Sequence, residues 1–297
     1  MRKFDFKKID AFATCKSDGN PAGYIKLNSF GDINDEDMLK IASQLKGFVN
    51  EVGYVAKIDN NSYKLRYFSS EREVEFCGHA TIAIMYDIIK NTKELENVLE
   101  VNIITNKGHL LVENNIKEED AIFIMAPLPT FKARKIPIEK IAEALKIEVA
   151  DIDLSYEIDI INGGLDTLII AVNELEKILS LKPEQEELKE FCIENNLDII
   201  EVFCKETVNA NNAYRTRVFA PTFGYLEDPA TGSGNSAFGY YLLKHKLWNG
   251  QVLSIEQNGF KDRYNVIKLK TLIDSNDVRR VLFGGGAIVR IEGKYNL

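Results

Sequence analysis

The chain has 297 residues, of which 45% are hydrophobic and 28% charged, and its 37 basic and 45 acidic side chains give a formal net charge of −8. This composition is typical of a globular protein and excludes collagen-like, low-complexity and wholly disordered chains. The length suffices for two domains, each with its own core. The acidic balance argues against nucleic acid as a partner, because such binding rests on clustered Lys and Arg.

Targeting and cofactor motifs are missing from the sequence. The first ten residues carry charges where a signal peptide needs an apolar segment, and no apolar run approaches the roughly 18 residues of a membrane span. The four cysteines form no Cys-x-x-Cys pair, the three histidines no zinc-binding motif, and no glycine-rich nucleotide loop occurs. We therefore expect a reduced, cytoplasmic protein with no metal, no cofactor and no contact with a membrane.

In the first half, β-branched and aromatic alternation predicts strands, and helical spacing of apolar residues predicts helices. In chain order these are a strand at 5–14, a helix at 35–45, strands at 51–57 and 61–68, a helix at 81–90, and strands at 98–104, 109–114 and 121–127. Asn34 is a plausible cap of the first helix. The second helix is apolar almost all round and is therefore expected to be buried.

The segment Pro127-Leu128-Pro129 marks the expected domain boundary. Beyond it the patterns predict a helix at 138–145, strands at 156–162 and 167–172, a helix at 183–195, strands at 199–207 and 214–219, a helix at 234–244, and strands at 252–257, 264–269 and 286–291. Each half is strand-rich with one buried helix, which differs from the regular alternation of a parallel α/β sheet. The fold class is therefore α+β.

An internal repeat relates the two halves. Arg66-Tyr67-Phe68 leads to Cys77-Gly78-His79 and a buried helix, and Arg217-Val218-Phe219 leads to Thr231-Gly232-Ser233 and a second buried helix. Thr231 stands 154 positions after Cys77, about half the length of the chain. The repeat predicts a duplicated fold with a cleft between two related halves.

Each repeated turn delivers backbone N–H groups at a helix start, where partial positive charge suits a carboxylate or a phosphate. The alternative is that Thr81, and Ser233 or Asn235, merely cap their own helices. When the two turns are considered together, anion binding and simple capping of the helices are about equally favoured.

Four side chains near these turns each have a catalytic and a structural interpretation. His79 is in the first helical turn, where the positive helix end favours a neutral imidazole that can relay a proton, or it is a packing residue. Cys77 is a thiol base or a small buried hydrophobe, and the threonine at position 231 favours the second. Asp228 is an acid–base group or the cap of the next turn. Glu51, beside an apolar strand, is a general base or an ordinary exposed residue.

Motifs along nearly the whole chain resemble the PhzF phenazine-biosynthesis-like family, which is related to diaminopimelate epimerase. They are Gly19-Asn20-Pro21, Asn50-Glu51-Val52-Gly53, Cys77-Gly78-His79-Ala80-Thr81, Glu227-Asp228-Pro229-Ala230-Thr231-Gly232-Ser233, Gln257-Asn258-Gly259 and Gly284-Gly285-Gly286. The resemblance implies a diaminopimelate-epimerase-like fold of two pseudo-repeated domains, each with a curved sheet around a central helix, and an active site between them. The expected domains are 1–126, joined by the terminal strand 284–297, and 127–283.

The resemblance also implies roles for individual residues. Glu51 matches the proton-transferring glutamate, and His79 and Asp228 match the residues that assist it. The turns at Gly78 and at Gly232–Ser233 would hold the substrate carboxylate. Asn20 and Gln257 would border the site, and the family's frequent pairing predicts a homodimer.

The characterised reaction of the resembled family is a cofactor-free isomerisation in phenazine biosynthesis, in which a proton moves along a conjugated ring. We therefore expect an isomerase acting on a small carboxylate that is cyclic or unsaturated. One alternative is an amino-acid racemase or epimerase of the diaminopimelate type, which needs two opposed cysteines. Only Cys77 is present, and Thr231 occupies the second position. The other alternative is a carboxylate-binding protein without catalysis.

Overall fold

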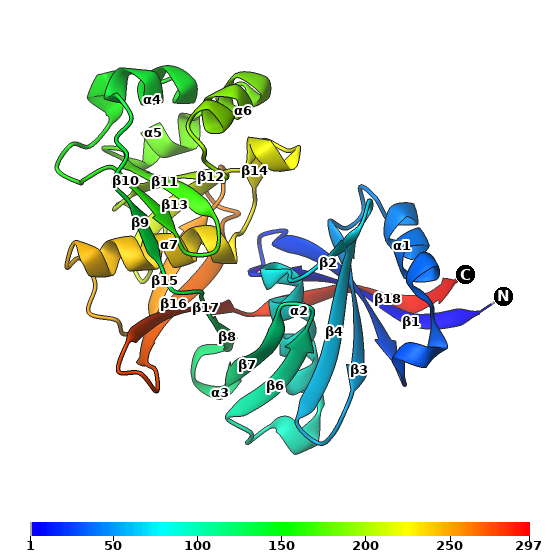
Figure 1. Cartoon of the computed structure of the whole chain (residues 1–297). Coiled ribbons are helices and arrows are strands. Elements are labelled where there is room, and N and C mark those ends of the chain that lie inside the picture. Colours follow the sequence, from blue (N-terminus) through cyan, green and yellow to red (C-terminus); the bar gives the residue numbers. More distant parts are fainter. Residues whose placement is uncertain (1) are drawn as a thin grey trace. The chain divides into compact units, whose positions relative to one another are not determined.

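The structure is a computed structural model that describes residues 2–297 (Figure 1). The chain divides into two compact units. The first comprises the chain up to Met125 together with Gly284–Leu297, and the second comprises Ala126–Phe283. Within residues 2–297, every helix is too short or too polar to cross a membrane.

The first unit is a curved sheet with one helix enclosed by it. Its strands are β1 (Lys3–Ala11), β2 (Asn20–Leu27), β3 (Glu51–Lys57), β4 (Ser62–Ser69), β5 (Glu73–Val74), β6 (Glu100–Thr105), β7 (Gly108–Asn115), β8 (Ala121–Met125) and β18 (Ala287–Asn296). Its α-helices are α1 (Asp35–Gln44), α2 (Gly78–Asn91) and α3 (Ile116–Glu119), with short 3-10 turns at Phe30–Asp32 and Lys93–Leu95.

Helix α2 forms the core of this unit. Its residues from Ala80 to Ile89 are all buried, and it packs against β1, β2, β3, β8 and β18. The strand order is β18-β1-β2-β3-β4-β6-β7-β8, antiparallel except for the parallel pairs β2–β3 and β4–β6. Gly53 lets β3 lie close to α2, because a Cβ atom at this position would be 2.3 Å from Cδ1 of Ile84. Helix α1, capped by the Asn34 side chain as predicted, packs on β3 and β4.

The second unit has the same plan with more helices outside. Its strands are β9 (Thr130–Lys132), β10 (Asp159–Asn162), β11 (Asp166–Ala171), β12 (Ile199–Cys204), β13 (Tyr214–Phe219), β14 (Glu227–Asp228), β15 (Leu253–Gln257), β16 (Asn265–Ile273) and β17 (Arg279–Gly285), whose last residues belong to the first unit. Its α-helices are α4 (Ile138–Leu145), α5 (Leu175–Ser180), α6 (Gln185–Glu194) and α7 (Gly232–Lys244), with 3-10 turns at Val149–Asp151 and Pro221–Phe223.

Helix α7 is the buried helix of this unit and packs against β10, β11, β12 and β16. The strand order is β9-β10-β11-β12-β13-β15-β16, again antiparallel except for two parallel pairs, β11–β12 and β13–β15. On the other face of the sheet, α4, α5 and α6 contribute to a second apolar core. The succession of pairings thus repeats that of the first unit strand by strand.

The repeat holds at the level of residue register. Phe68 pairs with Glu73 in the first unit, and Phe219 pairs with Glu227 in the second. In the neighbouring strands, Phe68 pairs with Val52 and Phe219 with Ile200. The next residues, Gly53 and Glu201, therefore occupy equivalent places. The sequence repeat reflects a duplicated structure.

Several predicted boundaries were wrong. Strands β2, β5, β9, β14 and β17 and helices α3 and α5 were missed, and the predicted strand at 156–162 begins only at Asp159. The two central helices begin earlier than predicted, at Gly78 and Gly232. Glycine disfavours a helix in propensity scales, but at these first helical positions tertiary packing outweighs that preference.

Candidate active site

The two central helices begin without a side-chain cap. The residues that precede them, Cys77 and Thr231, both have extended backbone, and neither side chain accepts a hydrogen bond from its helix. Thr81 Oγ1 donates to the carbonyl of Cys77 at 2.6 Å, and Asn235 Nδ2 donates to that of Thr231 at 2.8 Å. The interpretation of Thr81 and Asn235 as caps is therefore wrong, because a cap must accept a hydrogen bond from a helical N–H group.

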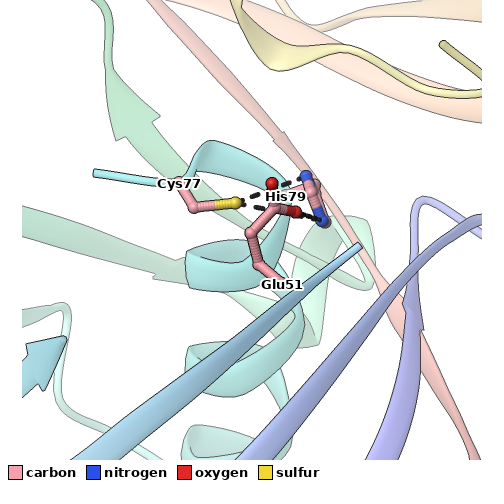
Figure 2. A group of neighbouring side chains, drawn as sticks. All are labelled: Glu51, Cys77 and His79. Carbon is pink, nitrogen blue, oxygen red and sulfur yellow. Dashed lines mark hydrogen bonds and ion pairs between the residues drawn. The ribbon is translucent and has the colours of Figure 1, made fainter. Parts of the chain in front are cut away.

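In the first unit, Glu51, Cys77 and His79 form one cluster (Figure 2). Nε2 of His79 lies 3.2 Å from Oε2 of Glu51, and Nδ1 of His79 lies 3.5 Å from Sγ of Cys77. The side chains of His79 and Glu51 are 13% and 23% exposed, and Cys77 is buried. Glu51 begins β3, whereas Cys77 directly precedes α2 and His79 is the second residue of that helix. The first residue of a strand and the start of a helix thus bring a carboxylate, an imidazole and a thiol together.

Electrostatics within this cluster overturn one sequence prediction. Burial alone lowers the pKa of His79, but the Cys77 sulfur and the Glu51 carboxylate outweigh burial and hold the pKa of this imidazole well above its usual 6.5. This direction opposes the neutral imidazole expected from the helix start, because local sequence does not show the carboxylate 3.2 Å away. Burial raises the pKa of the Cys77 thiol, and the neighbouring His79 ring opposes part of that shift.

Asn20 lies on the strand next to Glu51. It begins β2 and is buried, and Ala22, two residues later, pairs with Glu51 in the parallel β2–β3 ladder. The Asn50 side chain donates to Oδ1 of Asn20 at 3.3 Å. Gly78 is the first residue of α2. The predicted residues of the first unit, Asn20, Glu51, Gly78 and His79, therefore all lie around the start of α2.

The predicted residues of the second unit gather around the start of α7. Gly232 and Ser233 are its first two residues, and Asp228 lies in the short strand β14 just before it. Gln257, at the end of β15, accepts hydrogen bonds from Thr231 N at 3.1 Å and from Asn235 Nδ2 at 2.7 Å. Its own Nε2 donates to the carbonyl of Asp228 at 2.8 Å. Gln257 therefore connects the Asp228 strand to the helix start.

Sequence reasoning missed two features of these sites. It treated Cys77 as packing, yet the sulfur contacts the His79 ring, and the spacing Cys-x-His at a helix start was the available signal. It also missed Asn235, whose amide joins Thr231 and Gln257. That contact joins helix α7 to the end of β15, 22 positions later in the sequence, and local periodicity does not reveal it.

Comparisons with known proteins identify the family and the fold of the chain. Residues 9–293 match the family described as phenazine biosynthesis-like protein. An uncharacterized isomerase of Clostridium acetobutylicum is 29% identical over 299 residues, which cover 97% of both chains. The crystal structure of a Bacillus anthracis phenazine biosynthesis protein of the PhzF family superimposes with a TM-score of 0.88 at 24% identity, over all of both chains. A hydroxyproline epimerase from Agrobacterium vitis gives a TM-score of 0.53 at 10% identity, over 99% of this chain and 92% of the other.

These matches show the family and the fold. The chain belongs to the phenazine biosynthesis-like family, and several of its curated relatives are named uncharacterized isomerases. Its fold is the diaminopimelate-epimerase-like fold predicted from the sequence, which it shares with proteins of the PhzF and proline-epimerase groups.

Proposed function

We propose that this member of the phenazine biosynthesis-like family is an isomerase that moves a proton on a small carboxylate, cyclic or unsaturated, without a cofactor. The observation that carries the proposal is the contact between Oε2 of Glu51 and Nε2 of His79, 3.2 Å apart at the start of a buried helix. A carboxylate base paired with a protonated imidazole is a suitable arrangement for general acid–base catalysis.

In the proposed reaction, Glu51 removes a proton from a carbon atom next to a carbonyl or conjugated group. The electron pair is delocalised into the conjugated system, and the proton returns to another carbon atom of the same molecule. The reaction neither adds nor removes atoms or electrons, so it needs no redox partner. His79 keeps the Glu51 carboxylate oriented and shares the proton with it.

The substrate carboxylate is proposed to bind N–H groups at the helix starts. Gly78 in α2, and Gly232 and Ser233 in α7, supply such groups, and the partial positive charge of a helix start favours an anion. Asp228 is proposed to assist proton transfer, in keeping with its place in the family motif.

Deuterium exchange tests the assignment of Glu51. The protein is incubated in D2O with a panel of cyclic and unsaturated carboxylates, and deuterium at carbon is followed by NMR. Glu51→Gln should slow exchange by roughly 10²- to 10⁴-fold, the usual contribution of a general base. The matched control is Glu190→Gln, because Glu190 is exposed on α6. Exchange at the wild-type rate in Glu51→Gln would exclude Glu51 as the base.

The two alternatives give different products in the same experiment. A racemase would yield the mirror-image or epimeric substrate with deuterium at one stereocentre. A binding protein would be stabilised by a carboxylate without any exchange. Thr231 in place of a second cysteine argues against the racemase, since a threonine hydroxyl is too weak an acid–base group for that exchange.

Two further expectations concern the location of the protein in the cell and its oligomeric state. Location in the cytoplasm and pairing into a homodimer both follow from the sequence analysis. Light scattering coupled to size-exclusion chromatography tests the second, with a dimeric mass as the expected result.

A further inference from the structure

We propose that Glu51, Cys77 and His79 also form a binding site for a thiophilic divalent cation such as Zn²⁺, and that the bound cation inhibits the enzyme. The inhibition rests on the proposed function, whereas the binding does not. The three side chains offer one carboxylate oxygen, one sulfur and one ring nitrogen. Zinc in proteins is held by this set of donor types.

The spacing of the donor atoms fits a metal ion. All three lie within 4.8 Å of one another, with Nε2 of His79 3.2 Å from Oε2 of Glu51 and 3.9 Å from Sγ of Cys77. Tetrahedral zinc bonds of ordinary length place neighbouring donors about 3.3 to 3.6 Å apart. Side-chain movements of up to about an ångström would therefore complete the coordination.

Glu51 gives independent support. Its Oε2 atom is buried and, among the described residues, accepts no hydrogen bond of good geometry, although the His79 ring stands at ion-pair distance. Buried carboxylate oxygens are normally paired, because leaving them unpaired costs free energy. A cation between Glu51, Cys77 and His79 would satisfy this oxygen.

The charge balance is also favourable. The start of α2 carries partial positive charge and repels a cation that lacks compensation. Thiolate and carboxylate together carry two negative charges, which neutralise a divalent ion. Binding releases the proton of Sγ, and that of Nε2 when the imidazole is protonated, to solvent. The cation thereby occupies the carboxylate and the imidazole that proton transfer requires, while three protein donors leave one coordination position open.

Metal binding is measured first, without any substrate. The protein is stripped with a chelator and titrated with Zn²⁺ against a chromophoric competitor, and separately with Co²⁺, whose bond to a thiolate gives a charge-transfer absorption band. We expect one ion per chain and a thiolate band. Cys77→Ser should remove the band and weaken Zn²⁺ binding at least about 10- to 100-fold, the loss typical of removing only an outer-shell partner.

Matched variants separate this site from other metal-binding groups. Cys15→Ser removes an exposed thiol, and His245→Asn removes a histidine that lies 2.6 Å from Asp159 elsewhere in the fold. Both should bind Zn²⁺ as the wild type does, whereas Glu51→Gln and His79→Asn should bind weakly with unchanged circular dichroism. Wild-type affinity in Cys77→Ser, or a missing Co²⁺–thiolate band in the wild type, would overturn the site.

The second arm measures inhibition. Zn²⁺ should stop deuterium exchange in proportion to occupancy, and a chelator should restore it. Full exchange at one bound Zn²⁺ per chain would overturn the inhibition. Zn²⁺ binding with no exchange on any carboxylate would uphold the site and remove the proposed isomerase. If the protein binds no Zn²⁺ but its deuterium exchange depends on Glu51, the isomerase is upheld and the metal site is overturned.

Discussion

Arg217 donates two parallel hydrogen bonds to Glu227, from Nε to Oε1 at 2.9 Å and from Nη2 to Oε2 at 2.7 Å. Arg66 binds Glu73 through the same atoms in the first unit, at 2.6 and 2.8 Å. Each pair fixes a two-residue strand just before a central helix. The segment before each central helix is therefore held by the same interaction, a bidentate Arg–Glu ion pair. The two parallel hydrogen bonds of such a pair fix its geometry as well as neutralise the charges.

The Arg217→Met substitution tests the contribution of the Arg217–Glu227 ion pair to stability. It removes both bonds to Glu227 and two more that Nη1 donates to the carbonyls of Ile178 and Leu181. We expect a loss of about 2 to 3 kcal/mol in the free energy of unfolding, below the roughly 3–5 kcal/mol of a fully buried pair because Glu227 is 22% exposed. The measurement is urea unfolding.

A control and a second readout accompany this variant. Arg134→Met removes hydrogen bonds to Glu194 and Asn195 at the surface and should change stability by less than about 0.5 kcal/mol. Because Asp228 follows Glu227, Arg217→Met should also lower kcat. Wild-type stability in Arg217→Met would show that the pair contributes nothing.

Gln257→Met should disturb the start of α7. The substitution preserves side-chain length but leaves Thr231 N–H and Asn235 Nδ2 without their buried acceptor. We expect a loss of about 1 to 3 kcal/mol in the free energy of unfolding. The KM for the carboxylate should rise more than kcat falls, because the helix start is proposed to bind the substrate. Gln257→Glu retains an acceptor and should restore part of both. Unchanged KM in Gln257→Met would separate this network from substrate binding.

Glu201 predicts a specific pH dependence of stability. Its side chain is fully buried on β12, and neither of its oxygens has a hydrogen-bond partner among residues 2–297. Burial raises the pKa of this carboxyl well above its usual 4.5. The unfolded chain therefore loses this proton at lower pH than the folded chain does. Above pH 4.5 the unfolded state binds fewer protons, so the free energy of unfolding falls as pH rises.

The Glu201→Gln substitution removes that contribution. The variant should gain stability over the wild type between pH 5 and pH 8, by up to about 1.4 kcal/mol per pH unit. Urea unfolding at four pH values measures the difference, and Glu190→Gln, an exposed substitution on α6, should show none. A difference between Glu201→Gln and wild type that is constant across this range would rule out a buried protonated carboxyl.

Cys77→Ala distinguishes the isomerase from a racemase. In the proposed isomerase, Glu51 and His79 remain in contact, so deuterium exchange should persist within about tenfold of the wild-type rate, far less than the loss of a general base. Stability should fall by about 1 kcal/mol, as for other small deletions in a core. Complete loss of exchange in a folded Cys77→Ala protein would assign the thiol an essential role in proton transfer.

Much of the fold could be read from local pattern. The repeat, the two buried helices, the Asn34 cap and most strands follow from spacing and apolar periodicity. Short strands such as β9 and β14 could not be found, because they are defined by their partners rather than by any pattern of their own. The true helix starts at Gly78 and Gly232 were missed because glycine has poor helix propensity.

The sequence by itself determined that two related turns each open a buried helix, and its resemblance to a family singled out Glu51, His79 and Asp228. Only the tertiary structure decided that Glu51 lies 3.2 Å from His79, which sets the charge of the imidazole. It also decided that Glu201 is buried where the first unit has Gly53, beside Gly234 of α7. The physical reason is that the periodicity of apolar residues indicates only which face of a helix or strand a residue lies on. The distance between two charged side chains depends instead on strand pairing and helix packing between segments that are distant in the sequence.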